Sequence, residues 1–256
     1  MKKILKYTLI PLFWIAIWYL CAIKYGNKVL FPYPDQVILK LFELLKTSTF
    51  YLALINSLYR IFLGTFIAIV LGVILAILAA KINFVNSLLK PLLSAVKAVP
   101  VTVFVFIVYL ILLKNTSMFI CILMVFPIIF TNVYEGIINV NKEMVEVCQL
   151  YNLSFKNKLS ALYIPSVAPY FISSLSTAVG LAWKAEIAAE VLCPPSKISI
   201  GGNIAGYKDA IIQNSELFAT AFVLILLNLI IEFSLRKIIK FIMQKKFPDF
   251  EVVKWR

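Results

Sequence analysis

The stretch NVNKEMVEVCQLYNLSFKNK, residues 139–158, is a polar segment between two long apolar runs, and LSALYIPSVAPYF, residues 159–171, follows it directly. Charged and amide side chains are costly in hydrocarbon, so this segment is expected to lie outside a lipid bilayer. A segment that is also helix-forming and amphipathic is well placed there to bind a soluble partner.

The composition predicts an all-α polytopic membrane protein. Of the 256 residues, 62% are hydrophobic and 14% are charged, against about 45–50% and about 25% in globular proteins. The length fits one integral domain and leaves no room for a separate soluble domain. The net charge of +13 is not a nucleic-acid signal, because excess Lys and Arg in membrane proteins collects in cytoplasmic loops.

About six apolar runs approach the roughly 20 residues needed to cross the hydrocarbon core. They cover residues 7–23, 57–80, 91–113, 118–138, 166–192 and 216–236. An even number places both termini on one side. With that side cytoplasmic, the inner segments carry more than twice as many Lys and Arg as the outer ones. This asymmetry predicts cytoplasmic termini and a cytoplasmic location for residues 139–158.

The predicted organisation has three parts. Residues 1–50 hold a first transmembrane helix and an extracytoplasmic amphipathic connector, 34–47, which is too short to span the bilayer. Residues 51–240 form the transmembrane core, and residues 241–256 form a basic cytoplasmic tail. A cleaved signal peptide is the alternative for the first apolar run, but no small-x-small cleavage site follows it. The four cysteines are scattered without metal or redox spacing and are expected to pack as small apolar groups.

The polar segment itself predicts a helix, a sharp turn and a second helix. Glu143 and Glu146 recur at helical spacing, and the pattern breaks at Asn152. Asn accepts the left-handed conformation that ends a helix, and Ser154 can cap the helix that follows. Two short helices joined at a fixed angle would make a rigid projection that leads into the fifth apolar run at Pro165.

This region resembles a cytoplasmic motif of the permease subunits of binding-protein-dependent ABC importers. Their pattern is E-A-A, three residues, G, nine residues, I-x-L-P. This chain has Glu146-Val147-Cys148, three residues, Asn152, nine residues, then Leu162-Tyr163-Ile164-Pro165. The spacing matches throughout, and the departures are Val147, Cys148, Asn152 and an exchange of Leu and Ile.

Further motifs resemble the nitrate/sulfonate/taurine branch of these permeases, in the same order along residues 50–240. They are Ser57-Leu58-Tyr59-Arg60 with Gly64 and Gly72; Lys97-Ala98-Val99-Pro100; Ala182-Trp183-Lys184-Ala185 running to Ala189-Glu190; Ser199-Ile200-Gly201-Gly202; and Leu217-Phe218-Ala219. Each motif alone is a weak signal, whereas five in the right order are a strong one. The chain is therefore identified as resembling a membrane subunit of this branch.

The resemblance implies a type I ABC importer permease-like fold, with a coupling loop over residues 139–165, in a bacterial inner membrane. It implies a non-catalytic subunit that binds no cofactor, paired with a second permease copy as a homodimer. A separate cytoplasmic ATPase would hold ATP-Mg, and an extracytoplasmic binding protein would deliver a small, possibly anionic solute. The ATPase-coupling residues would be Glu146, Val147, Cys148, Tyr151, Asn152, Leu153 and Pro165. The chain lacks the G-x-x-x-x-G-K-[ST] loop that would cradle nucleotide phosphates.

The candidate pathway or gate residues are charged or aromatic groups in the spans: Trp183, Lys184, Glu186, Glu190 and Arg60. Such charges usually face protein or water. Glu186 and Glu190 are four residues apart on one helical face and repel unless solvated, paired or protonated. The structural alternative places Glu190 at the outer interface and has Lys184 snorkelling or pairing across subunits. Both alternatives stay open, and Glu186 has no counterpart in the motif.

Two other functions compete with the importer. An ion-coupled secondary transporter would need in-membrane carboxylates or broken helices serving an ion, often with an inverted repeat. No internal repeat is visible. A membrane-embedded enzyme would need convergent ligands or acid–base groups, and the chain has no histidine and no carboxylates in a metal-ligand pattern. Dependence of uptake on ATP rather than an ion gradient separates the first competitor from the importer.

Overall fold

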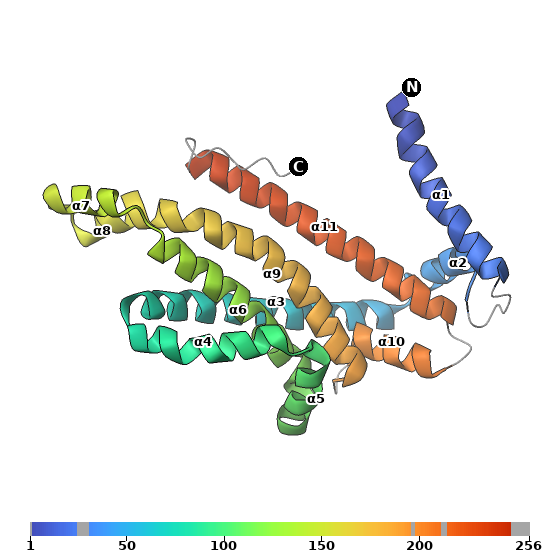
Figure 1. Cartoon of the computed structure of the whole chain (residues 1–256). Coiled ribbons are helices and arrows are strands. Elements are labelled where there is room, and N and C mark those ends of the chain that lie inside the picture. The colour runs from blue at the N-terminus through green and yellow to red at the C-terminus, as the bar shows by residue number, and fades with distance from the viewer. Residues whose placement is uncertain (1, 25–30, 196–197, 211–213, 247–256) are drawn as a thin grey trace.

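A computed structural model describes residues 2–24, 31–195, 198–210 and 214–246 (Figure 1). Every regular element in these ranges is a helix. The long helices are α1 (Lys2–Lys24), α3 (Ser48–Lys81), α6 (Thr116–Ile138), α9 (Ile164–Leu192) and α11 (Asn214–Lys246). The shorter ones are α2 (Pro34–Leu44), α4 (Asn83–Ala98), α5 (Val101–Leu112), α7 (Lys142–Leu150), α8 (Phe155–Lys158) and α10 (Ile200–Asp209). Of the predicted basic tail, residues 247–256 lie outside the described ranges.

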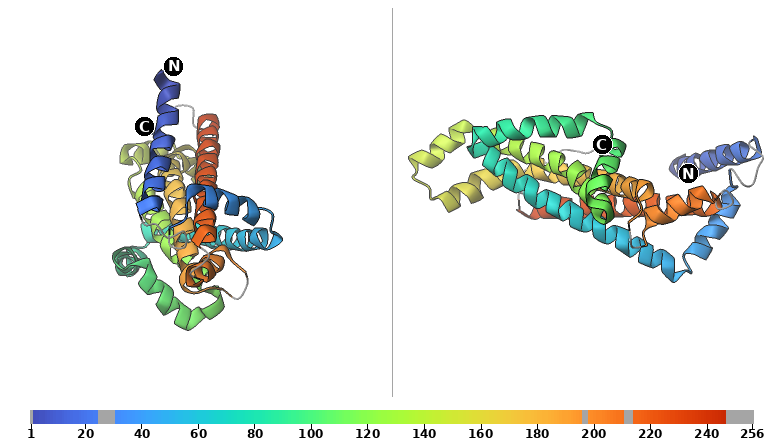
Figure 2. Two further views of the ribbon diagram at one scale, coloured as in Figure 1. Left: turned by 90° about the vertical axis from the view of Figure 1, so that its right-hand side faces the viewer. Right: turned by 90° about the horizontal axis from the view of Figure 1, so that it is seen from below.

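The centre of the bundle is formed by α3, α6 and α9, which run side by side in both views of Figure 2. The α3–α4 turn and the α7–α8 region lie at one end of this bundle, and α10 lies at the other (Figure 1). The first helix, α1, projects away from it (Figure 1).

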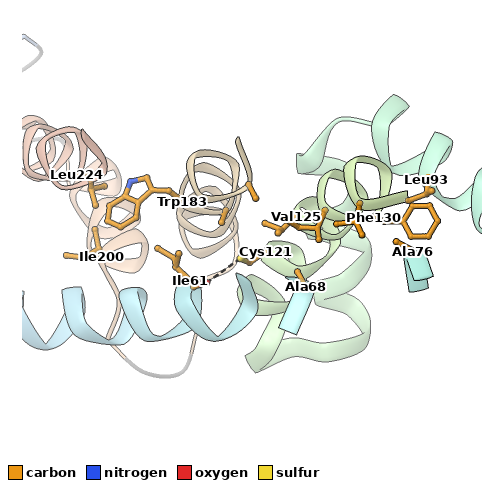
Figure 3. Close-up of a cluster of buried hydrophobic side chains, with 14 of the residues drawn as sticks. Ile61, Ala68, Ala76, Leu93, Cys121, Val125, Phe130, Trp183, Ile200 and Leu224 are labelled. Carbon is orange, nitrogen blue, oxygen red and sulfur yellow. Dashed lines mark hydrogen bonds between the residues drawn. The ribbon is translucent and has the colours of Figure 1, made fainter. Parts of the chain in front are cut away.

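Small residues on α3 allow α6 to approach closely. Gly64, Ala68, Gly72 and Ala76 recur every fourth residue along α3 and are buried. A Cβ atom at Gly72 would lie only 2.8 Å from Cγ2 of Ile129 on α6. Small residues at this spacing let helix backbones pack tightly in a membrane, where dispersion contacts replace the hydrophobic effect. Figure 3 shows Ala68 and Ala76 facing the α6 side chains of this core.

The third predicted span, 91–113, is not one continuous helix. α4 ends at Ala98, Val99 is extended (φ −92°, ψ 134°), and α5 begins after Pro100. Proline disfavours the helical conformation in the residue before it and lacks an N–H to continue the ladder. α5, at 12 residues, is about 18 Å long and cannot cross a core of about 30 Å by itself.

Four segments of the described chain are long and apolar enough to cross a membrane. They are Ser48–Lys81, Val101–Ile138, Phe155–Leu192 and Asn214–Ile239, and a shorter apolar stretch covers Leu9–Lys24. The last of the predicted spans, 216–236, falls within α11, and the first, 7–23, falls within α1. The all-helical, multi-pass fold class is confirmed, with the third span divided by Pro100.

The amphipathic connector is a helix, as predicted. α2 begins at Pro34, and Gln36 accepts the N–H of Tyr33 at 3.3 Å. Lys40 pairs with Glu43 at 2.7 Å and with Glu216 of α11 at 3.2 Å. Hydrogen bonds to these two carboxylates raise the pKa of the Lys40 ammonium. The ion pair between Lys40 and Glu216 links α2 to the first turn of α11.

The cysteines carry no disulfide in the described chain. Cys121, Cys148 and Cys193 are buried and Cys21 is partly buried. Cys121 and Cys193 belong to the buried apolar clusters, as the sequence predicts, and the Cys121 thiol also donates to the carbonyl of Ile61 (3.8 Å).

Candidate functional site

The first candidate site is a helical projection at the end of the bundle, made of α7, a turn and α8. Asn141 caps α7, because its side-chain oxygen accepts the N–H groups of Glu143 (2.8 Å) and Met144 (3.4 Å). The cap satisfies donors that would otherwise have no partner in the first turn. The start of α7 is therefore fixed by the side chain of Asn141, the residue directly before the helix.

The turn after α7 has the left-handed residue that the sequence predicts. Asn152 adopts φ 47°. Its N–H donates to the carbonyl of Gln149 (2.9 Å), and the N–H of Leu153 donates to the carbonyl of Cys148 (3.1 Å). This pair of bonds is the Schellman arrangement that closes a helix. Ser154 then caps α8 by accepting the N–H of Asn157 at 3.3 Å. The predicted helix–turn–helix is confirmed.

Large apolar side chains are exposed on this projection. Leu150 is 80% exposed, Tyr151 77% and Phe155 73%. In contrast, Cys148 is buried and Leu153 is partly buried. Large apolar side chains exposed to water are typical of an interaction surface, and the sequence predicts that this segment lies outside the bilayer.

The remaining predicted coupling residues divide between the projection and the bundle. Glu146, Val147 and Asn152 are exposed on the projection. Pro165 lies in the first turn of α9, directly after a π-helical segment, Leu159–Tyr163. A proline lacks the N–H that an α-helix would use there, and π segments adjust the backbone locally. Together α8, the π segment and α9 form one helical run, Phe155–Leu192.

The second candidate site is a buried polar network at the opposite end of α9. Glu190 is fully buried and is ion-paired with Arg60 of α3. The second carboxylate oxygen of Glu190 accepts the hydroxyl of Ser57 (2.7 Å) and the N–H of Gly201 (3.0 Å). Ser57 Oγ in turn accepts the N–H of Ile200 at 3.1 Å. The carboxylate therefore joins α3, α9 and the first turn of α10.

Gly201 is required by the closeness of this contact. A Cβ atom there would collide with Cβ of Glu190 and would lie 2.9 Å from the carbonyl oxygen of Ile187 and from the backbone nitrogen of Val191. The last two are backbone atoms of α9 and cannot move away as a flexible side chain could. In the sequence, Ser57 and Gly201 stand out only as parts of motifs, and nothing there indicates their contact with Glu190. The available signal was the position of Ser57 three residues before Arg60, which places both on one face of a helix.

The other predicted pathway residues are dispersed. Trp183 is buried in the core beside Ile200 and Leu224 (Figure 3). Lys184 is exposed on α9. Glu186 is fully buried one turn before Glu190, and its carboxylate oxygens have no hydrogen-bond partner among the described residues. The structure thus brings Arg60 and Glu190 together, places Trp183 beside Ile200 of the same network, and leaves Lys184 exposed.

No cluster of three or more His, Cys, Asp or Glu able to hold a metal ion occurs in the described part of the chain. Arg60 and Glu190 are already paired with each other. The arrangement is suited to holding α3, α9 and α10 together.

The architecture defines a class, a multi-pass helical membrane protein with a capped helical projection at one end. The model of the family "binding-protein-dependent transport system inner membrane component" matches residues 68–243. The chain belongs to this family, which confirms the resemblance drawn from its motifs.

Several known sequences are similar to the chain over most of its length. A protein of Methanocaldococcus jannaschii bearing the name of an ABC transporter permease is 27% identical over 93% of this chain and 90% of its own. The nitrate import permease protein of Synechococcus elongatus is 28% identical over 75% of this chain and 73% of its own. The formylaminopyrimidine transport permease protein of Halalkalibacterium halodurans is 26% identical, over 70% and 72%.

Proposed function

We propose that this permease is the membrane-spanning subunit of an ATP-driven importer and that α7 docks a separate cytoplasmic ATPase. The observation that carries the proposal is the exposed apolar cluster of Leu150, Tyr151 and Phe155 on a projection capped at both helices. Exposed apolar area of this kind gains free energy when a partner removes it from water. Glu146 and Val147 lie exposed on the same helix and would contribute to the docked surface.

Movement of the docked ATPase would be transmitted along α9. The run Phe155–Leu192 is about 57 Å long at 1.5 Å per residue. Its first turn belongs to the projection and its last turns carry Glu190. A displacement of α7 and α8 would therefore reach the contact between Glu190, Arg60 and α10 through one continuous helix. We propose that this contact is the gate of the pathway. Glu186 and Trp183, which are buried on α9 before Glu190, would stabilise the position of that helix.

The remaining partners follow from the family. Two copies of the chain would form the pathway as a homodimer in the inner membrane of a bacterium, with cytoplasmic termini. A binding protein outside the membrane would deliver the solute. ATP and Mg²⁺ would be held by the ATPase, so that this chain needs no cofactor of its own. The names of two relatives refer to nitrate and to formylaminopyrimidine. We propose a small solute, and an anion would suit the exposed ammonium of Lys184 on α9.

Co-purification in mild detergent tests the docking surface. The tagged chain should retain a soluble ATPase in stoichiometric amount, and Tyr151→Ala or Glu146→Lys should lose it. The matched control is Tyr59→Ala, which removes another exposed tyrosine from α3 (64% exposed) and should keep the ATPase. Equal retention by all three variants would refute docking at α7.

Energy dependence separates the importer from an ion-coupled secondary transporter. Vesicles containing the co-purified complex should accumulate solute only when ATP is supplied on the side of α7. Accumulation that follows an ion gradient without ATP would overturn the proposal in favour of the secondary transporter.

A further inference from the structure

A large cleft lies beneath the projection, between α7 and the bundle. Its volume is about 770 Å³, within the range of ligand sites. α7 contributes Val145, Cys148 and Gln149 to one wall, and α3, α6 and the 155–171 part of the long helical run form the others. We call it the α7 cleft.

The lining of the α7 cleft changes from basic to apolar along its depth. On α3 the lining residues are Val73, Ile77, Ala80 and then Lys81 at the helix end. On the antiparallel run, Phe155 and Lys158 come first, and Val167 and Phe171 lie deeper. At a rise of 1.5 Å per residue, Val73 lies about 12 Å from Lys81 along the axis of α3. Phe171 lies about 20 Å from Lys158 along the axis of the antiparallel run. Both lysines are therefore at the same end.

From this gradient we infer that the α7 cleft binds an anionic phospholipid, with its phosphate at Lys81 and Lys158 and an acyl chain along the apolar walls. Among the described residues that line the cleft there is no carboxylate to repel the phosphate. Basic pockets between membrane helices on the side of an anionic leaflet bind acidic headgroups, and each lysine near the surface contributes attraction. The deeper walls, from Val73 to Phe171, suit hydrocarbon and not a polar solute.

A lipid bound in the cleft would also affect the position of α7. Val145 and Cys148 of α7 form part of its wall, so a bound acyl chain would fill the space between α7 and α3. Filling apolar space restores the dispersion contacts that an empty cleft lacks. The lipid would thereby hold α7 against the bundle. This inference concerns a lipid site and goes beyond the docking of an ATPase.

Lipid retention by the full chain tests the inference. The chain is reconstituted into bilayers of phosphatidylcholine and phosphatidylglycerol, extracted in mild detergent and examined by native mass spectrometry. Wild type should retain phosphatidylglycerol in preference to phosphatidylcholine. The double variant Lys81→Gln/Lys158→Gln should lose about tenfold or more of this preference. The matched control, Lys90→Gln/Lys156→Gln, removes the same charge from lysines that do not line the cleft and should behave as wild type.

A second variant separates a lipid from other occupants. Ala168→Phe places a large side chain inside the cleft and should abolish retention of either phospholipid while the lysines remain. Unchanged lipid retention in both Lys81→Gln/Lys158→Gln and Ala168→Phe would overturn the inference. Dissociation of the dimer by Ala168→Phe with unchanged lipid retention would also overturn it, because a second copy of the chain would then fill the cleft.

Discussion

Glu190 is held by three neighbours at once, so the loss of its charge should be costly. Glu190→Gln would leave the guanidinium of Arg60, whose side chain is 13% exposed, without its counter-ion. Removing one partner of a buried ion pair typically costs about 3–5 kcal/mol. We expect thermal unfolding of the detergent-solubilised chain at a clearly lower temperature than wild type.

Glu186→Gln is the matched control for this loss of stability. Glu186 is as fully buried as Glu190 and lies on the same helix, but no hydrogen bond to its carboxylate oxygens occurs among the described residues. Its replacement by an amide of the same size should lower the unfolding temperature much less. Equal losses in the two variants would mean that burial of a carboxylate, and not the pairing with Arg60, determines stability at this end of α9.

The packing of α10 depends on Gly201, because the first turn of α10 lies directly against the backbone of α9. Gly201→Ala would press a methyl group against Ile187 and Val191, at 2.9 Å from a backbone atom of each. Overpacking of this kind typically costs about 1–3 kcal/mol. Thermal unfolding should therefore shift to a lower temperature, and α10 should become more susceptible to limited proteolysis.

Gly206, in the same helix, provides the comparison. A Cβ atom at Gly206 would meet nothing within 4 Å. Gly206→Ala should stabilise the chain by up to about 1 kcal/mol, because alanine has the higher helix propensity. If Gly201→Ala were as stable as Gly206→Ala, the close contact between α10 and α9 would not exist in solution.

Local signals in the sequence predicted the elements whose ends are set by nearby residues. Asn152 and Ser154 predicted the turn of the projection, because a left-handed residue and a helix cap act within a few residues. Pro100 carries the same kind of signal, but the apolar composition of residues 91–113 predicts one span across it, and the structure divides this segment into α4 and α5. The contact between Arg60 and Glu190 joins residues 130 positions apart. Periodicity within one helix cannot indicate such a partner.

At the scale of the whole molecule, α8 and the Glu190 network occupy opposite ends of one helical run, and α7 is joined to α8 by the turn at Asn152. Transmission between them requires a projection that does not bend at its turn. The left-handed conformation of Asn152 (φ 47°) is the point where the turn depends on one residue. A non-glycine residue in this conformation costs about 1–2 kcal/mol, and a β-branched side chain tolerates it least.

Asn152→Val should therefore uncouple transport while leaving the chain in the membrane. We expect ATP-driven uptake into vesicles to fall several-fold, with the amount of membrane-inserted chain unchanged. Asn152→Gly is the control, because glycine adopts a positive φ without steric cost, and it should retain uptake. Equal uptake by Asn152→Val and Asn152→Gly would show that transport does not depend on a rigid turn. A loss in both variants would instead assign the effect to the missing amide side chain and not to the backbone conformation.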